Sequence, residues 1–168
     1  KKFQKKISGN ITKRKLFKKI RIGYYSADFR NHVMSFLLAH LFELHDRSKF
    51  ELIAFSFGPN KNDEMRKRIS RNFDQFIDVN LKTDKEIALH SRDLKIDIAV
   101  DLMGHTMHNR IGIFIERCAP IQVNYLGYSG TSGVKCLDYI IADKTIIPEK
   151  NQKYYSEKIV YIPGTFMA

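Results

Sequence analysis

The sequence predicts a doubly wound α/β fold with a mostly parallel sheet. Short apolar segments rich in β-branched residues alternate along the chain with segments whose apolar residues have helical spacing. Right-handed crossovers between parallel strands place such helices on both faces of one sheet. The chain has 168 residues, of which 43% are hydrophobic, so it is long enough for one domain with a substantial core.

The first half of the chain contains three predicted strands, each followed by a predicted helix. Asp28 or Asn31 is placed to cap the first helix, which covers residues 32–46. Thr83, with Glu86 three residues later, has the capping-box spacing for the third helix. The broad apolar face of the first helix is expected to comprise Phe36, Leu37, Leu38, Leu41, Phe42 and Leu44. The other predicted elements of this half are strands 20–26, 50–57 and 75–79, a charged and exposed helix over 63–71, and the third helix through residue 94.

The second half is predicted to hold four more strands and one more helix. The helix covers residues 110–117 and ends before Ala119-Pro120, because helical conformation is disfavoured for the residue before a proline. The strands are 96–102, 121–126, 139–142 and 158–162. The sequence contains no internal repeat.

The net charge of +11 is concentrated in the first 21 residues, which carry ten Lys and Arg residues and no acid. The rest of the chain is nearly neutral. Such an arm can bind nucleic acid or anionic lipid, but neither an aromatic stacking platform nor a zinc signature accompanies it. We therefore interpret residues 1–20 as a solvated linker and residues 21–168 as the folded domain, with neither nucleic acid nor membrane as the expected partner.

Cysteine usage and the chain ends bear on the setting of the protein. Cys118 and Cys136 have no metal or redox motif, so we expect two small buried residues in a reducing, cytoplasmic compartment, and no disulfide is indicated. No apolar run reaches membrane-spanning length, and no signal peptide is present. The chain begins at Lys1 and stops just after a predicted strand, so we expect it to be a piece of a longer protein.

Polar segments follow three of the predicted strands. They are residues 26–32 (SADFRNH), 104–108 (GHTMH) and 127–133 (GYSGTSG). The carboxyl ends of parallel strands share one edge of a sheet, and ligands bind beyond that edge. We therefore expect these three segments to converge on one crevice.

Residues in these segments are suited to chemistry, and each also has a purely structural interpretation. His32 opens a helix, whose dipole favours the neutral imidazole that a general base requires, but a histidine there can equally cap or pack. His105 can likewise be an ordinary loop residue. The three glycines of 127–133 let backbone N–H groups approach an anionic or sugar ligand, although the segment is neither a Walker A loop nor GxGxxG and can be a plain connector.

Two classes of chemistry are not indicated. The chain has no Asp-x-Asp, no paired cysteines and no His-Glu-x-x-His, so no metal is expected. Asp101 has the chemistry of a metal ligand but is as readily a polar strand end. A nucleophilic hydrolase is not expected either, because no Gly-x-Ser-x-Gly elbow is present.

Taken together, the polar segments resemble the catalytic region of the protein O-linked N-acetylglucosamine (O-GlcNAc) transferases, glycosyltransferase family 41. Order and spacing match from about Arg21 to the end of the chain, and the run from Ala119 to Thr131 is the most specific part. The matching stretches are RIGYYSADFRNHVMSFL (21–37), VDLMGHTMHNRIGIF (100–114), RCAPIQVNYLGYSGTSG (117–133), DYIIAD (138–143) and YSEKIVYIPGTF (155–166).

The resemblance implies an enzyme with the GT-B fold, in which two Rossmann-like lobes enclose a cleft and tetratricopeptide (TPR) repeats precede them. This chain would be the N-terminal lobe. Members of the family transfer N-acetylglucosamine from UDP-GlcNAc to Ser/Thr hydroxyls of proteins, with inversion and without a metal or cofactor. In the family the C-terminal lobe supplies most contacts to UDP and a lysine for the leaving diphosphate, so this chain alone is expected to be inactive.

The resemblance also assigns roles to individual residues. His32, in the motif Asp-Phe-x-Asn-His, matches a histidine that acts near the acceptor hydroxyl. Asp28 and Asn31 of the same motif are expected to bind substrate. His105 and Thr106 match a loop that lines the sugar pocket. The residues that match the loop bordering the donor site are Leu126, Gly127, Tyr128, Gly130 and Thr131.

Two positions depart from the family pattern. Phe36 stands where members often place a second histidine or another ring, which argues against a two-histidine mechanism. Ser129 replaces the usual proline and loosens the loop slightly. The alternative hypothesis is a Rossmann-like module that holds a ligand or protein partner without catalysis. The sequence fixes neither the donor sugar nor the acceptor.

Overall fold

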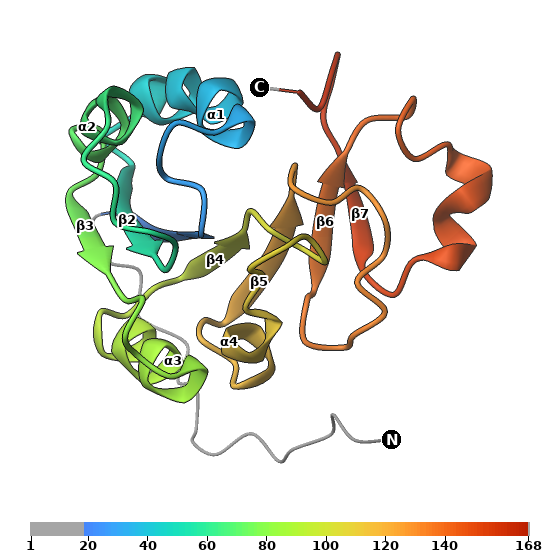
Figure 1. The fold of residues 1–168 in the computed structure, drawn as a ribbon. Coiled ribbons are helices and arrows are strands. Elements are labelled where there is room, and N and C mark those ends of the chain that lie inside the picture. The colour runs from blue at the N-terminus through green and yellow to red at the C-terminus, as the bar shows by residue number, and fades with distance from the viewer. Residues whose placement is uncertain (1–18, 168) are drawn as a thin grey trace.

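The computed structural model describes residues 19–167, which form a seven-stranded sheet in the order β3-β2-β1-β4-β5-β6-β7 (Figure 1). All neighbouring strands are parallel. The strands are β1 (Ile20–Ser26), β2 (Phe50–Ser56), β3 (Gln75–Asp78), β4 (Ile98–Asp101), β5 (Ile121–Tyr125), β6 (Tyr139–Ala142) and β7 (Lys158–Tyr161). All seven predicted strands are present, and residues 1–18 of the predicted linker lie outside the described residues.

Helices cover both faces of the sheet, as the prediction required (Figure 1). The helices α1 (Val33–Leu44) and α2 (Glu64–Ser70) share one apolar cluster with alternate residues of β1 and β2. The helices α3 (Asp84–Asp93) and α4 (Ile111–Ile115) share a second cluster with the intervening residues of the same strands. From β1 the chain continues to β2 and β3 on one side, and from β4 it continues to β5, β6 and β7 on the other. Ligands of doubly wound sheets bind at such a switch point, beyond the carboxyl ends of the strands.

The two clusters are packed around aromatic side chains of the central strands. Tyr24 points toward α1 and meets the Phe42 ring edge-on, with ring centroids 5.0 Å apart. Tyr25, the next residue, points to the opposite face and stacks on Phe55 at 4.5 Å. This alternation explains why the central strands are apolar throughout, because both of their faces are buried.

The face of α1 that packs on the sheet differs from the predicted one. Phe36 and Leu44 were expected to be buried, but their exposed fractions are 61% and 68%. Phe36 is two positions from the buried Leu38, and Leu44 is two positions from the buried Phe42. Two positions correspond to a rotation of about 200° around the helix axis, so both side chains point away from the sheet. That face consists of Ser35, Leu38, Ala39 and Phe42.

Three smaller expectations are also corrected. The helix α2 is charged but not simply exposed, since Arg66 is buried and donates to Asp78 at 2.5 Å. A short 3₁₀ helix, η1 (Glu149–Tyr154), was not predicted. Cys118 is buried as expected, whereas Cys136 is only half-buried, and both thiols are free. No helix within residues 19–167 has the length and apolar character needed to span a membrane.

Candidate functional site

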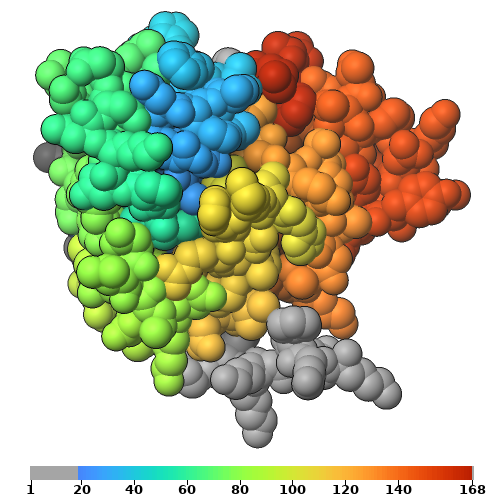
Figure 2. Space-filling view, viewed as in Figure 1, coloured from blue at the N-terminus to red at the C-terminus, as the bar shows by residue number. Residues whose placement is uncertain are grey.

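The three predicted loops lie side by side at the carboxyl ends of β1, β4 and β5, which are neighbours in the sheet. After β4, the Met103 thioether accepts hydrogen bonds from the Ser26 hydroxyl and the Ala27 N–H, both at 3.4 Å. On the other side, Gly127 lies so close to the Leu102 carbonyl that a methyl group would overlap it. Figure 2 shows the segment after β4 between the start of α1 and the loop after β5. The predicted convergence is confirmed.

His32 lies half exposed where the first loop becomes α1. Its Nδ1 accepts a hydrogen bond from the Met34 N–H at 3.3 Å, so His32 caps the helix in place of the predicted Asp28 or Asn31. The Asp28 carboxylate lies 3.5 Å from the same Nδ1. A ring nitrogen either donates or accepts, so these two partners compete. When Nδ1 carries the proton and faces Asp28, Nε2 presents the lone pair that a general base requires.

Asp28 and Asn31 also fix the shape of the first loop. Asp28 is buried, and its carboxylate pairs with Arg30 at 3.1 Å. The Asn31 side-chain oxygen accepts from the Met65 N–H at 3.3 Å, and the Asn31 N–H donates to Asp63 at 2.9 Å. These bonds dock the loop on the start of α2, so the amide oxygen predicted to meet substrate is engaged by the protein.

The turn after β4 is built on Asp101. Its buried carboxylate accepts hydrogen bonds from the Met103 N–H at 2.9 Å and the Gly104 N–H at 3.2 Å. Burial raises the pKa of Asp101 to about 6, although these donors and nearby His105 favour the charged form. The Thr106 hydroxyl donates to the Met103 carbonyl at 2.9 Å. Asp101 is therefore a polar residue at the end of β4 that closes the turn. The Thr106 hydroxyl proton is bound within the same turn and is not available to a ligand.

His105 joins this turn to the loop after β5. Its Nε2 lies 2.8 Å from the Ser132 carbonyl. A carbonyl only accepts, so Nε2 carries the proton and Nδ1 of the neutral ring is left as an acceptor. The His105 ring also meets the Tyr128 ring edge-on, with centroids 5.6 Å apart. Both of these predicted site residues are exposed, which leaves them open to a ligand.

The glycine-rich loop is anchored by Glu157, a residue that sequence reasoning missed. The buried Glu157 carboxylate accepts from the Thr131 hydroxyl at 2.8 Å, the Ser132 N–H at 2.7 Å and the Ser132 hydroxyl. Burial alone would raise the pKa of Glu157, but these donors outweigh it and lower the pKa. The Tyr155 hydroxyl adds a bond to the Ser129 carbonyl at 2.9 Å. The sequence signal that could have identified Glu157 is the position of an acidic residue directly before the apolar strand β7.

Backbone geometry at the start of this loop is tight. Leu126 has a φ of 69°, in the left-handed region that favours glycine, and the Gly127 N–H donates to the Tyr125 carbonyl at 2.9 Å. Such conformations cost about 1–3 kcal/mol and concentrate at functional sites. Leu126 is buried and packs in the same apolar cluster as α1, so its side chain belongs to the core. Gly130 lies against the Tyr128 ring, where a methyl group would be too close.

The site offers acid–base and hydrogen-bonding chemistry. Within residues 19–167 no group of three or more His, Cys, Asp or Glu residues is arranged to hold a metal ion. Burial raises the pKa of Cys118 to about 12 and that of Cys136 to about 11, so neither thiol is a nucleophilic thiolate at neutral pH. The chemistry at the edge is therefore that of a histidine beside a carboxylate, flanked by loops with exposed N–H and ring groups.

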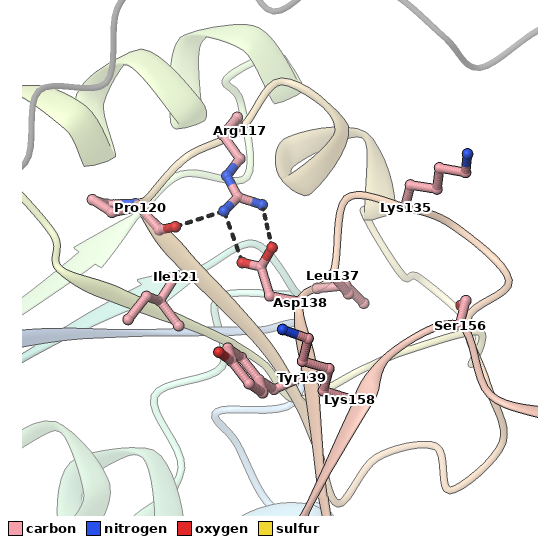
Figure 3. A pocket seen from close by; sticks show the side chains of 9 residues that line it. All are labelled: Arg117, Pro120, Ile121, Lys135, Leu137, Asp138, Tyr139, Ser156 and Lys158. Carbon is pink, nitrogen blue, oxygen red and sulfur yellow. Dashed lines mark hydrogen bonds and ion pairs between the residues drawn. The ribbon is translucent and has the colours of Figure 1, made fainter. Parts of the chain in front are cut away.

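A separate pocket of about 370 Å³ opens at the opposite edge, at the amino ends of β5, β6 and β7 (Figure 3). Arg117 binds both oxygens of Asp138 there, at 2.9 and 2.8 Å, and donates to the Pro120 carbonyl at 2.5 Å. The Arg117 guanidinium therefore stabilises the fold through these bonds and is not free to bind a ligand. Lys135 and Lys158 also line this pocket, but none of the predicted site residues does, and ligands of parallel sheets bind at the carboxyl ends.

The fold and the site together define the class of the chain. An all-parallel, doubly wound sheet with a histidine–carboxylate pair and two polar loops at its carboxyl edge is a Rossmann-like lobe. The family model described as glycosyl transferase family 41 matches residues 3–168. The chain belongs to this glycosyltransferase family, which confirms the resemblance found in the sequence.

Individual relatives agree with this assignment. A probable UDP-N-acetylglucosamine–peptide N-acetylglucosaminyltransferase of Arabidopsis thaliana is 39% identical over 150 residues, which is 89% of this chain and 15% of that protein. The Caenorhabditis elegans enzyme of that name is 36% identical over 153 residues, covering 88% of this chain and 13% of its own length. This chain therefore spans only a small part of the curated relatives that it matches.

Solved structures show the same fold. A mutant O-GlcNAc transferase from Thermobaculum terrenum superposes with a TM-score of 0.86 and 32% identity, covering 89% of this chain and 29% of that one. The lipopolysaccharide outer core galactosyltransferase WaaB matches with a TM-score of 0.52 and 15% identity over 86% of this chain and 46% of that one, which shows likeness of fold alone.

Proposed function

We propose that residues 21–168 form the N-terminal lobe of a GT-B glycosyltransferase that moves N-acetylglucosamine from UDP-GlcNAc to Ser/Thr hydroxyls of proteins. The reaction is inverting and needs no metal. The observation that carries this proposal is the meeting of the three loops after β1, β4 and β5, which brings the loop that holds His32 to the same edge of the sheet as the loops that hold His105 and Tyr128. The family and the names of the relatives supply the class of donor and acceptor.

His32 is the proposed base. In the tautomer with its Nδ1 proton toward Asp28, Nε2 takes the proton of the acceptor hydroxyl. The acceptor oxygen forms a bond to the anomeric carbon, the bond from that carbon to the diphosphate oxygen breaks, and the electron pair leaves with UDP. Asp28 stabilises the imidazolium that results, as a carboxylate does in other histidine-based sites.

The other two loops are proposed to bind the donor. His105 and Thr106 lie at the sugar, and the backbone of residues 126–131 borders it, with Tyr128 on the exposed side. The developing charge on the diphosphate needs positive groups, and we propose that a C-terminal lobe supplies them. The proposed remaining partners are TPR repeats upstream and a protein acceptor, and the proposed location is the cytoplasm.

A substitution in the whole protein tests the role of His32. We expect His32→Ala to abolish most glycosyl transfer while UDP-GlcNAc binding, measured by calorimetry, is retained. His40→Ala is the matched control, since His40 lies exposed on the same helix and its ring meets only Glu43, at 3.4 Å. Full turnover by His32→Ala would refute the assigned base, and binding of UDP-GlcNAc without transfer by the wild-type protein would favour the non-catalytic module.

A further inference from the structure

Two polar side chains at the ends of neighbouring strands hold the loops of the site. Asp101 and Asn124 are paired in register on β4 and β5. Asp101 accepts the N–H groups of Met103 and Gly104, at 2.9 and 3.2 Å. Asn124 donates to the Tyr128 carbonyl at 3.1 Å. The turn after β4 and the loop after β5 are thus fixed side by side from inside the sheet.

The turn held by Asp101 contacts both other loops. Through its thioether, Met103 accepts the Ser26 hydroxyl of the first loop at 3.4 Å. Gly104 has a φ of 56° and lies against Tyr128, where a methyl group would overlap the side chain. The two residues whose N–H groups bind Asp101 therefore each touch a neighbouring loop, Met103 the loop after β1 and Gly104 the loop after β5.

We propose that Asp101 is a positioning residue for sugar transfer, whose carboxylate fixes the turn after β4 and thereby the spacing of the three loops. This inference rests on the proposed function. Asp101 is 2% exposed, so it does not touch substrate. It acts through His105 and Thr106, which follow directly in the turn that it closes.

Both carboxylate oxygens are required for this role. One accepts from Met103 and the other from Gly104. An amide offers one acceptor and one N–H group, so Asp101→Asn keeps one bond and sets N–H against N–H at the other.

The test compares wild type with Asp101→Asn in the whole protein. We expect the variant to raise KM for UDP-GlcNAc about tenfold, the usual effect of one lost hydrogen bond, with a smaller change in kcat. Hydrogen–deuterium exchange, corrected for intrinsic rates, should show residues 102–108 less protected in the variant at pH 7.5.

The matched control is Asp97→Asn, near the amino end of the same strand, where the Asp97 carboxylate accepts the Arg21 N–H at 2.8 Å. We expect Asp97→Asn to leave KM and the exchange of residues 102–108 unchanged. An active wild type with an unchanged Asp101→Asn variant overturns this inference alone. Loss of protection without a change in KM also overturns it. A wild type that transfers no sugar overturns the proposed function, and this inference with it.

Discussion

Replacing Glu157 tests whether the glycine-rich loop depends on one buried carboxylate. Glu157→Ala removes the acceptor of the Ser132 N–H and hydroxyl and of the Thr131 hydroxyl. Each buried donor left without a partner costs about 1–3 kcal/mol. Ser132 is buried and keeps two such donors, so we expect the free energy of unfolding to fall by about 3–4 kcal/mol. Glu157→Gln keeps one acceptor and should cost about 1–2 kcal/mol.

The assay is urea unfolding of the chain, followed by circular dichroism at several pH values. The donors lower the pKa of Glu157, so its contribution is complete above the ordinary value of 4.5 and is lost as the pH falls below it. The difference between wild type and Glu157→Gln should therefore shrink in acid. Glu149→Ala is the control, because Glu149 forms only an exposed ion pair with Lys144, and no measurable change is expected. If Glu157→Ala unfolds with the same urea midpoint as the wild type, the loop does not depend on this carboxylate.

Two further outcomes are expected. Gly127→Ala must displace the Leu102 carbonyl and should cost about 2–3 kcal/mol by the same assay, whereas Gly133→Ala, with open space and a φ of 64°, should cost about 1–2. The chain of residues 1–168 should transfer no radiolabelled sugar from UDP-GlcNAc, and robust turnover would show that no second lobe is needed.

The spacing of apolar residues, together with the capping, Gly and Pro residues between them, was sufficient to predict the strands and the four helices. The alternation of strands and helices then predicted that the three loops share one edge of the sheet. The Thr83–Glu86 capping box formed as expected, with bonds of 2.7 and 3.3 Å. The face of α1 was mispredicted because the chain is apolar on more than 200° of that helix, so composition alone did not separate the buried Leu38 from the exposed Phe36. Only packing against the sheet decides between them.

The site was predictable in its location and less so in its internal contacts. His32 and Asp28 are four residues apart in the short loop between β1 and α1, so their proximity is local in the sequence. The bond of Glu157 to Ser132 joins residues 25 positions apart through the pairing of β6 with β7, which no local pattern reports. Asn31 and Thr131 were expected at the substrate, and the structure shows that much of their hydrogen-bonding capacity already belongs to the fold.

The anchoring of the glycine-rich loop sets an order of assembly during synthesis. The contact between Ser26 and Met103 forms only after the 77 residues that follow Ser26 have been synthesised. The bond between Ser132 and Glu157 forms only after a further 25 residues have followed Ser132. Until β7 docks, the Thr131 and Ser132 donors of the nascent segment lack the Glu157 carboxylate that accepts them in the fold. Long-range contacts of this kind form late and open early. Ribosomes can be stalled with nascent chains of increasing length and treated with a protease. Cleavage within residues 127–138 is expected to stop only for chains in which residue 161 has left the ribosome, because β7 is then complete.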